Sequence, residues 1–312
     1  MSENLSPYRC IGRGHCGSTD VIKREDGSPN RSVSNDRIMH TRILQSFPTA
    51  YPDWWRSRLP SFPPDTLPCR AYHTERIPPM PLPVRQTIIT RYCPPQLQPF
   101  VRDNRDDEDC VLRVYHGRRK RVHESKFPRF CLRNYALCVD QMEELGRDTY
   151  QVARALAEAL VYCHWKACVD AEDAEFVLAP STFETSNKSV ETPTIEAFGQ
   201  EFVVWMVDFD RCGHMVDDEG GVEQAVQAFY RNDPYYPRPF AYGLTDEDEQ
   251  LWEAFKARYL QVSGGLLGGG DVQLAEMFIG EVERGIEEEE DGARSRGLKI
   301  SWAQRGRLRI LM

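Results

Sequence analysis

The second half of the chain carries the clearest pattern of hydrophobic and polar positions. Val152, Leu156 and Leu160 recur at helical spacing, so the pattern predicts an amphipathic helix over residues 149–165. The continuous apolar run at 202–207 is typical of a buried strand, and 176–178 predicts a shorter strand. Asp217 or Asp218 is placed to cap a further helix. Another helix is predicted over 246–261, and the glycine-rich stretch 263–270 predicts a flexible linker.

The first half is less regular, because residues 47–100 hold most of the prolines. Helical spacing still predicts short helices at 36–46 and 84–92. Residues 111–115 alternate like a strand, and Gly117 offers a turn after it. With a partner strand within 130–137, this pattern predicts a hairpin over 111–135. Residues 179–198 are rich in Ser, Thr and Glu, and they predict a loop insertion.

Composition sets limits on the class of protein. The chain has 312 residues, of which 41% are hydrophobic and 28% charged, so we expect a globular fold. The net charge of −9 excludes a uniformly basic nucleic-acid coat, but it allows a local basic patch. The longest clean apolar run has six residues, far below the ~20 of a membrane-spanning helix. No secretory signal is visible at the polar N-terminus, so we expect a cytoplasmic protein without contact to membranes.

The ten cysteines show no CxxC pair. Structural zinc usually takes two pairs of closely spaced ligands, so the spacing predicts no metal site. A reducing compartment disfavours disulfides, so we expect free thiols.

Two features near the N-terminus are typical of phosphate binding. Gly12, Gly14 and Gly17 form a GxGxxG pattern, in which glycine lets a backbone approach phosphate closely. Lys23 follows six residues later. No apolar strand precedes the pattern, so a glycine-rich turn is the plain alternative.

Four carboxylates lie within residues 170–175, between a predicted helix and a predicted strand. We expect Asp170, Asp173 and Glu175 to converge, so that repulsion raises the pKa of one of them and suits it to be a general base. The same carboxylates suit Mg²⁺ or a guanidinium group. A solvated acidic loop is the alternative. Asp208 and Asp210 follow the apolar run 202–207, at a strand end where ligand residues often lie.

The order of these features resembles a protein-kinase-like fold. The resemblance implies a two-lobed α+β protein, with a small lobe at 1–80 and a larger, mainly helical lobe at 81–312. Asp170 matches the catalytic-loop aspartate, and Asp208 matches the start of the DFG motif. Asp210 departs from the family pattern because it stands at the glycine of that motif, and His164 lies too far from Asp170 for an HRD motif.

Residues 113–133 are strongly basic. Eight Lys or Arg stand against Glu124 alone, a local charge of 8 − 1 = +7, and aromatic residues are interleaved. Such patches attract phosphate backbones, so the segment predicts RNA binding, with an exposed charged loop as the alternative. The basic residues are Arg113, Arg118, Arg119, Lys120, Arg121, Lys126, Arg129 and Arg133.

Several strings together resemble a fungal family whose members were labelled hypothetical or zinc finger proteins. They include IGRGHCG at 11–17, CVLRVY at 110–115, DAEFVL at 173–178 and FYRNDPYYPRP at 229–239, and the resemblance spans residues 11 to about 285. Some members are arginine-containing cyclodipeptide synthases. The resemblance therefore implies that arginyl-tRNA and a second aminoacyl-tRNA condense to a cyclic dipeptide in secondary metabolism.

This chemistry needs no cofactor, because aminoacyl esters are already activated. We expect the base and the guanidinium-binding roles to fall among Asp170, Asp173 and Glu175. Asp208, Asp210, Lys23 and the three glycines would support or bind the substrate, and the basic segment would bind tRNA rather than DNA. The alternatives are a kinase-like phosphotransferase that uses ATP and Mg²⁺ at Lys23, Asp170, Glu175 and Asp208, and a pseudokinase-like binding module.

Overall fold

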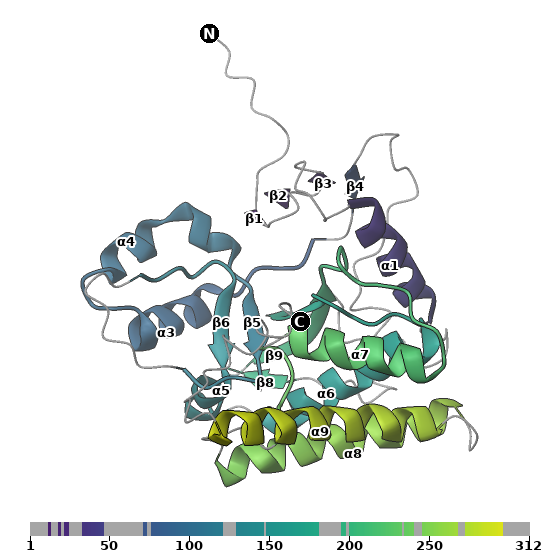
Figure 1. Ribbon diagram of the computed structural model, residues 1–312. Helices are drawn as coiled ribbons and strands as arrows, with labels where there is room; N and C mark the ends of the chain where they lie inside the picture. Colours follow the sequence, from purple (N-terminus) through teal and green to yellow (C-terminus); the bar gives the residue numbers. More distant parts are fainter. Residues whose placement is uncertain are drawn as a thin grey trace.

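The computed structural model gives a mixed α+β fold with two sheets (Figure 1). It describes residues 12–13, 18–19, 22–24, 33–46, 71–73, 76–120, 129–146, 148–180, 195–197, 200–232, 234–239, 245–267 and 272–295. In this part of the chain, no helix is long and apolar enough to cross a membrane.

The central sheet has five strands in the order β6-β5-β7-β9-β8. Their bounds are β5 Leu112–Tyr115, β6 Tyr135–Cys138, β7 Glu175–Pro180, β8 Ile195–Ala197 and β9 Gln200–Val207. β7 and β9 pair antiparallel with Glu175 opposite Val207, so the apolar runs at 176–178 and 202–207 are strands as predicted. β5 and β6 pair in parallel, with Leu112 opposite Tyr135. The hairpin predicted over 111–135 is therefore wrong, because parallel neighbours require a crossover connection instead of a tight turn.

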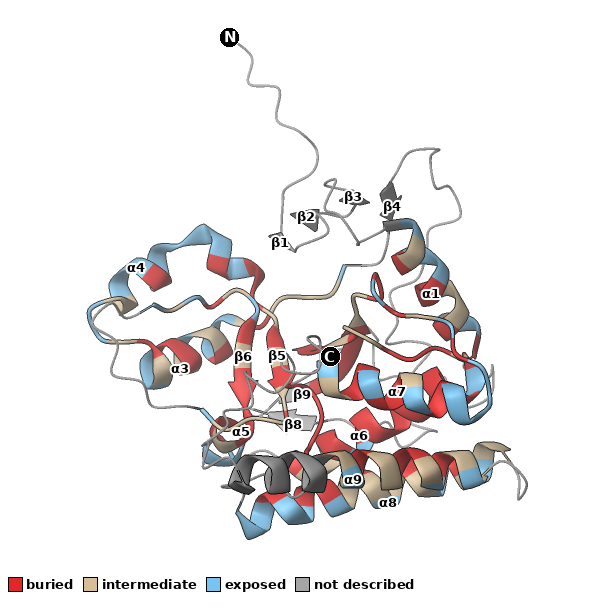
Figure 2. Ribbon diagram, in the orientation of Figure 1, coloured by how far each residue is buried: buried red, intermediate tan, exposed pale blue. Residues whose placement is uncertain are grey.

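Helices pack on one face of this sheet. The helix α6 (Thr149–Val161) is almost wholly buried between the sheet and α8 (Asp246–Leu267), as the red colouring in Figure 2 shows. It continues into a π-helical turn at Tyr162–Lys166. The helix and this turn together match the helix predicted over 149–165. The helix α9 (Val272–Ser295) packs on α8 and on α7 (Glu219–Arg231). The linker predicted at 263–270 is wrong in its first half, since residues 263–267 belong to α8.

The remaining elements flank this core. β1 (Gly12–Arg13), β2 (Ser18–Thr19), β3 (Ile22–Arg24) and β4 (Ala71–His73) form the second sheet, in that order. The predicted helices appear as α1 (Val33–Ser46) and α3 (Leu82–Tyr92), and α1 packs against the turn at 162–166. Shorter helices are α4 (Gln98–Asp103), a 3-10 turn (Arg105–Asp109) and α5 (Val139–Glu144).

The buried histidine His116 predicts a loss of stability in acid. Its Nε2 lies 3.1 Å from the carbonyl oxygen of Thr149, and burial lowers the pKa of His116 from 6.5 to about 4. Because the folded-state pKa is depressed, the unfolded chain binds more protons between these two values. The free energy of unfolding should therefore fall by about 3 kcal/mol as the pH drops from 6.5 to 4.

Urea unfolding at a series of pH values measures this effect. His116→Gln keeps a donor for Thr149 but does not titrate, so its stability should depend less on pH than that of the wild type. An identical pH dependence in both proteins would count against this assignment, and His164, whose pKa burial lowers to about 3, would account for the remaining loss.

Candidate active site

The carboxylate of Asp170 is the most highly organised group of the predicted site. Its Oδ1 accepts hydrogen bonds from the backbone amides of Glu172 (3.0 Å) and Gly213 (2.8 Å), and its Oδ2 accepts one from Nε2 of Gln224 (2.7 Å). Only 5% of the residue is exposed. A carboxylate offers about four lone-pair sites, so three donors leave one acceptor position on Oδ2.

Burial shifts the proton affinity of this group. It raises the pKa of the Asp170 carboxyl above its ordinary value, although the bonds from Gln224, Gly213 and Glu172 act in the opposite direction. Gly213 permits the close approach, because a Cβ at this position would lie 2.7 Å from Oδ2 of Asp170. Asp170 therefore has the character of a positioned proton acceptor.

The loop that carries Asp170 has an unusual backbone. Cys168, Ala171 and Asp173 have positive φ angles of 53°, 56° and 63°, and Asp208 has a φ of 65°. Each such non-glycine residue costs on the order of 1–3 kcal/mol and persists only where its surroundings fix it. Asn232 provides part of this support, since its Nδ2 donates to the carbonyl oxygens of Ala174 (2.8 Å) and Ala171 (3.4 Å).

Glu172 ties the loop to two other elements. It accepts from Arg211, in the turn after β9, and from Arg231, at the end of α7, each at 2.8 Å. The Glu172 side chain is 13% exposed, whereas both arginines are about half exposed. No motif in the sequence marks Glu172 as a site residue, and its bridging role is seen only in the structure.

The turn 208–213, which follows β9, is held by α1. The backbone amide of Phe209 donates to Oδ1 of Asp36 (2.9 Å), and the ring of His40 lies 5.3 Å from that of Phe209. Asn35 donates to the carbonyl oxygens of Asp210 (2.9 Å) and Cys212 (3.0 Å). The sequence predicted the helix that became α1. No spacing pattern indicated that the first turn of α1 would contact residues 209–212.

The buried thiol of Cys212 shows that the separate carboxylates lie in one neighbourhood. Burial raises the pKa of this thiol well above its ordinary value, and the nearby Asp170, Asp36 and Asp208 raise it further. Asp170, Asp36 and Asp208 therefore all lie around this thiol. Asp210, which is 3% exposed, lies in the same turn.

Glu175 lies on another side of this site. It forms an ion pair with Arg113 of β5, at 2.8 Å. Although burial lowers the pKa of Arg113, Glu175 and neighbouring tyrosines raise it overall. Asp173, the third predicted catalytic residue, lies in the loop between Asp170 and Glu175. The three carboxylates are thus close in sequence but have different surroundings.

The basic segment is partly neutralised by the fold. Arg119 pairs with Asp248 (2.7 Å) and Glu143 (2.8 Å), and Arg133 lies 3.5 Å from Asp106. The cation of Lys120 lies over the ring of Tyr135. Arg129 is exposed. The count of +7 within residues 113–133 therefore overstates the positive charge of this surface.

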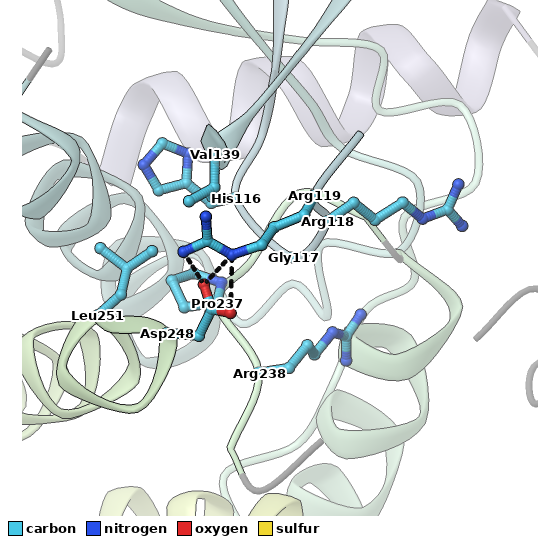
Figure 3. A pocket seen from close by; sticks show the side chains of 9 residues that line it. All are labelled: His116, Gly117, Arg118, Arg119, Val139, Pro237, Arg238, Asp248 and Leu251. Atoms are coloured by element: carbon cyan, nitrogen blue, oxygen red, sulfur yellow. Dashed lines mark hydrogen bonds and ion pairs between the residues drawn. The ribbon is translucent and has the colours of Figure 1, made fainter. Parts of the chain in front are cut away.

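A small pocket adjoins this segment (Figure 3). Figure 3 shows Arg119 directed at Asp248, while Arg118 and Arg238 point away from that pair. Arg238 is buried and lies over the rings of Phe229 and Tyr230. The residues that line the pocket are His116, Gly117, Arg118, Arg119, Val139, Pro237, Arg238, Asp248 and Leu251.

Several predicted residues lie outside the described residues. These are Gly14, Gly17, Arg121 and Lys126. Gly12 belongs to β1 and Lys23 to β3, where the structure describes the strands but not the side-chain surroundings.

One family model matches the chain. Residues 204–271 match a family described as "zinc finger protein". This segment contains Cys212 and His214 as its cysteine and histidine, whereas structural zinc takes four such ligands. No curated protein and no solved structure matches. The matching model carries no synthase description, so our identification of the chain as a member of the cyclodipeptide synthase family is wrong, and the comparison shows a partial similarity to the zinc finger family model instead.

Proposed function

We propose that the protein forms an arginine-containing cyclic dipeptide from aminoacyl-tRNAs, with the loop 168–175 and the turn 208–213 as its catalytic edge. The observation that carries this proposal is Asp170, a buried carboxylate that three donors hold in place and that retains one acceptor position. An α-amine has a pKa near neutrality, so a fixed carboxylate of raised pKa is suited to remove its proton.

The reaction balances without a further reactant. The α-amine of one aminoacyl group attacks the ester carbonyl of the other, so that a C–N bond forms and the C–O bond to ribose breaks. The proton taken from the amine passes to the departing ribose oxygen. The second amine then attacks the remaining ester in the same way, which closes the ring and releases the second tRNA.

Recognition of arginine is supported by the carboxylates beside Asp170. Glu172 binds two guanidinium groups of the chain itself, those of Arg211 and Arg231, and Glu175 binds that of Arg113. These contacts show that the loop 170–175 can bind guanidinium groups, and a substrate arginine would have to replace one of these internal partners.

A kinase-like phosphotransferase is the second candidate, and the turn 208–213 favours it. The left-handed Asp208, followed by Phe209 bound to Asp36 of α1, resembles the arrangement of the DFG motif beside a helix of the small lobe. In this reading the fold is two-lobed and kinase-like, and Lys23, Glu175 and Asp208 would serve ATP and Mg²⁺. A pseudokinase-like binding module would keep this geometry without chemistry.

Mass spectrometry of a host that expresses the chain tests the proposal. We expect a new product whose mass equals that of arginine plus one further amino acid less two waters, and we expect purified protein to form it only from charged tRNAs. If soluble protein forms no such product and ATP with Mg²⁺ raises its melting temperature, the phosphotransferase replaces this proposal. If ATP has no effect either, the binding module replaces it.

A further inference from the structure

Glu172 already binds the kind of group that a substrate arginine presents. Its Oε1 accepts from Nη2 of Arg211 and its Oε2 accepts from Nη1 of Arg231, each at 2.8 Å. The Glu172 side chain is 13% exposed, so its carboxylate reaches the surface. Its backbone is fixed, since its amide donates to Asp170 and its carbonyl oxygen accepts from the thiol of Cys212 at 3.3 Å. The chain therefore holds an accessible, positioned carboxylate with a guanidinium group on each oxygen.

Both guanidinium groups are weakly held. The side chains of Arg211 and Arg231 are 44% and 48% exposed. Each gives one hydrogen bond to one oxygen of Glu172, whereas the strong form of this pair joins two parallel N–H groups to both oxygens of a carboxylate. Ion pairs with partners this exposed contribute little to stability, because water competes for the charged groups. An incoming guanidinium group can therefore replace one of them at little cost.

Arg211 is the easier of the two to replace. It lies in the turn 208–213, and among the described residues its side chain forms a hydrogen bond with Glu172 alone. Arg231 lies at the end of α7, where the helix dipole favours a cation, and its Nη2 also contacts Oε1 of Gln227 at 3.5 Å. Arg231 therefore has support that Arg211 lacks.

We propose that Arg211 occupies the guanidinium site of the substrate in the free protein, and that the arginine side chain of the aminoacyl group displaces it from Glu172. This inference rests on the proposed function. The backbone amide of Glu172 lies 3.0 Å from Oδ1 of Asp170, so the site is about one side-chain length from the proposed base. Glu172 is thereby the residue that selects arginine, and Arg211 competes with the substrate for it.

The substitution Arg211→Ala tests the displacement, because it removes the competitor and leaves Glu172 in place. In calorimetric titration, L-arginine methyl ester should bind this variant about 3-fold more tightly than the wild type, in keeping with the loss of one exposed ion pair. Arg91→Ala is the matched control, since Arg91 is 45% exposed and pairs with Glu144 at 3.2 Å. It belongs to α3, which lies at the opposite side of the molecule from α7 (Figure 1), so this variant should bind the ester as the wild type does.

The substitution Glu172→Gln tests the selecting carboxylate, because it removes the charge and keeps the shape. The affinity for L-arginine methyl ester should fall at least 10-fold, since the bonds to the guanidinium group lose their charge assistance. L-norleucine methyl ester, which has no guanidinium group, should bind all four proteins equally weakly. Unchanged affinity for the arginine ester in Glu172→Gln, equal affinity in Arg211→Ala and the wild type, or no binding to either of these two proteins, would overturn the inference.

The two hypotheses fail separately. Dipeptide formation by Glu172→Gln with an unchanged KM for arginyl-tRNA would refute the role of Glu172 and keep the proposed function. Ester binding that Arg211→Ala strengthens and Glu172→Gln weakens, in a protein that forms no dipeptide, would keep the guanidinium site and refute the proposed function.

Discussion

Asp170→Asn should lower the rate of dipeptide formation about 1,000-fold, within the range that general-base catalysis provides. The substitution removes the proton acceptor but keeps an oxygen for the amides of Glu172 and Gly213. The fold should therefore persist, which circular dichroism and the melting temperature will show. Asp103→Asn, an exposed change at the end of α4, is the control and should retain full activity.

The pH dependence of the rate separates a base from a merely structural carboxylate. Gln224→Leu removes the donor to Oδ2 of Asp170, and this donor lowers the pKa of the carboxyl. The pKa of Asp170 should then rise further, so the acid limb of the kcat/KM profile should move to higher pH. Full activity of Asp170→Asn, or an acid limb that Gln224→Leu leaves unmoved, would exclude Asp170 as the base.

Gly221→Ala should lower the free energy of unfolding by several kcal/mol. A Cβ at this position would overlap the carbonyl oxygen of Val216, so the backbone on one side must shift. The shift would disturb the start of α7, where the amide of Gly221 donates to the capping Asp218 at 2.9 Å. Overpacking of this kind costs ~1–3 kcal/mol, and loss of a cap adds about 1 kcal/mol. Urea denaturation measures the sum.

Gly264→Ala provides the matched control. Gly264 lies within α8, and a Cβ there would meet no atom within 4 Å. Alanine in a helix interior should therefore stabilise the protein by roughly 0.5–1 kcal/mol. Equal stability changes in Gly221→Ala and Gly264→Ala would show that the contact with Val216 does not constrain residue 221.

Local sequence patterns were sufficient for most helices and for the two central strands. The 3.6-residue spacing of Val152, Leu156 and Leu160 identifies α6, and Asp218, one of the two predicted candidates, caps α7. The pairing of β5 with β6 was predicted, but its parallel direction was not, because a strand's own residues do not specify in which direction it joins a neighbour.

The site was predictable only in part, for a similar reason. The sequence shows that the carboxylates at 170–175 and Asp208 lie at the ends of predicted strands and helices, which marks them as candidate site residues. Their partners Gln224, Asn232 and Asp36 are ordinary positions on helices, and only folding brings them near. For the basic segment, the sequence overestimated the positive charge. Asp248, which pairs with Arg119, lies 129 residues away, so a local charge count does not include it.

The contact between Asp36 and the amide of Phe209 also bears on how the protein is made. The two residues are 173 positions apart, so at ~5–20 residues per second α1 is synthesised roughly 9–35 s before the turn that it holds. During this interval α1 can already pack against the turn at 162–166, but its contact with residue 209 is still missing. A product truncated before residue 209 therefore lacks the turn 208–213 and has no assembled site.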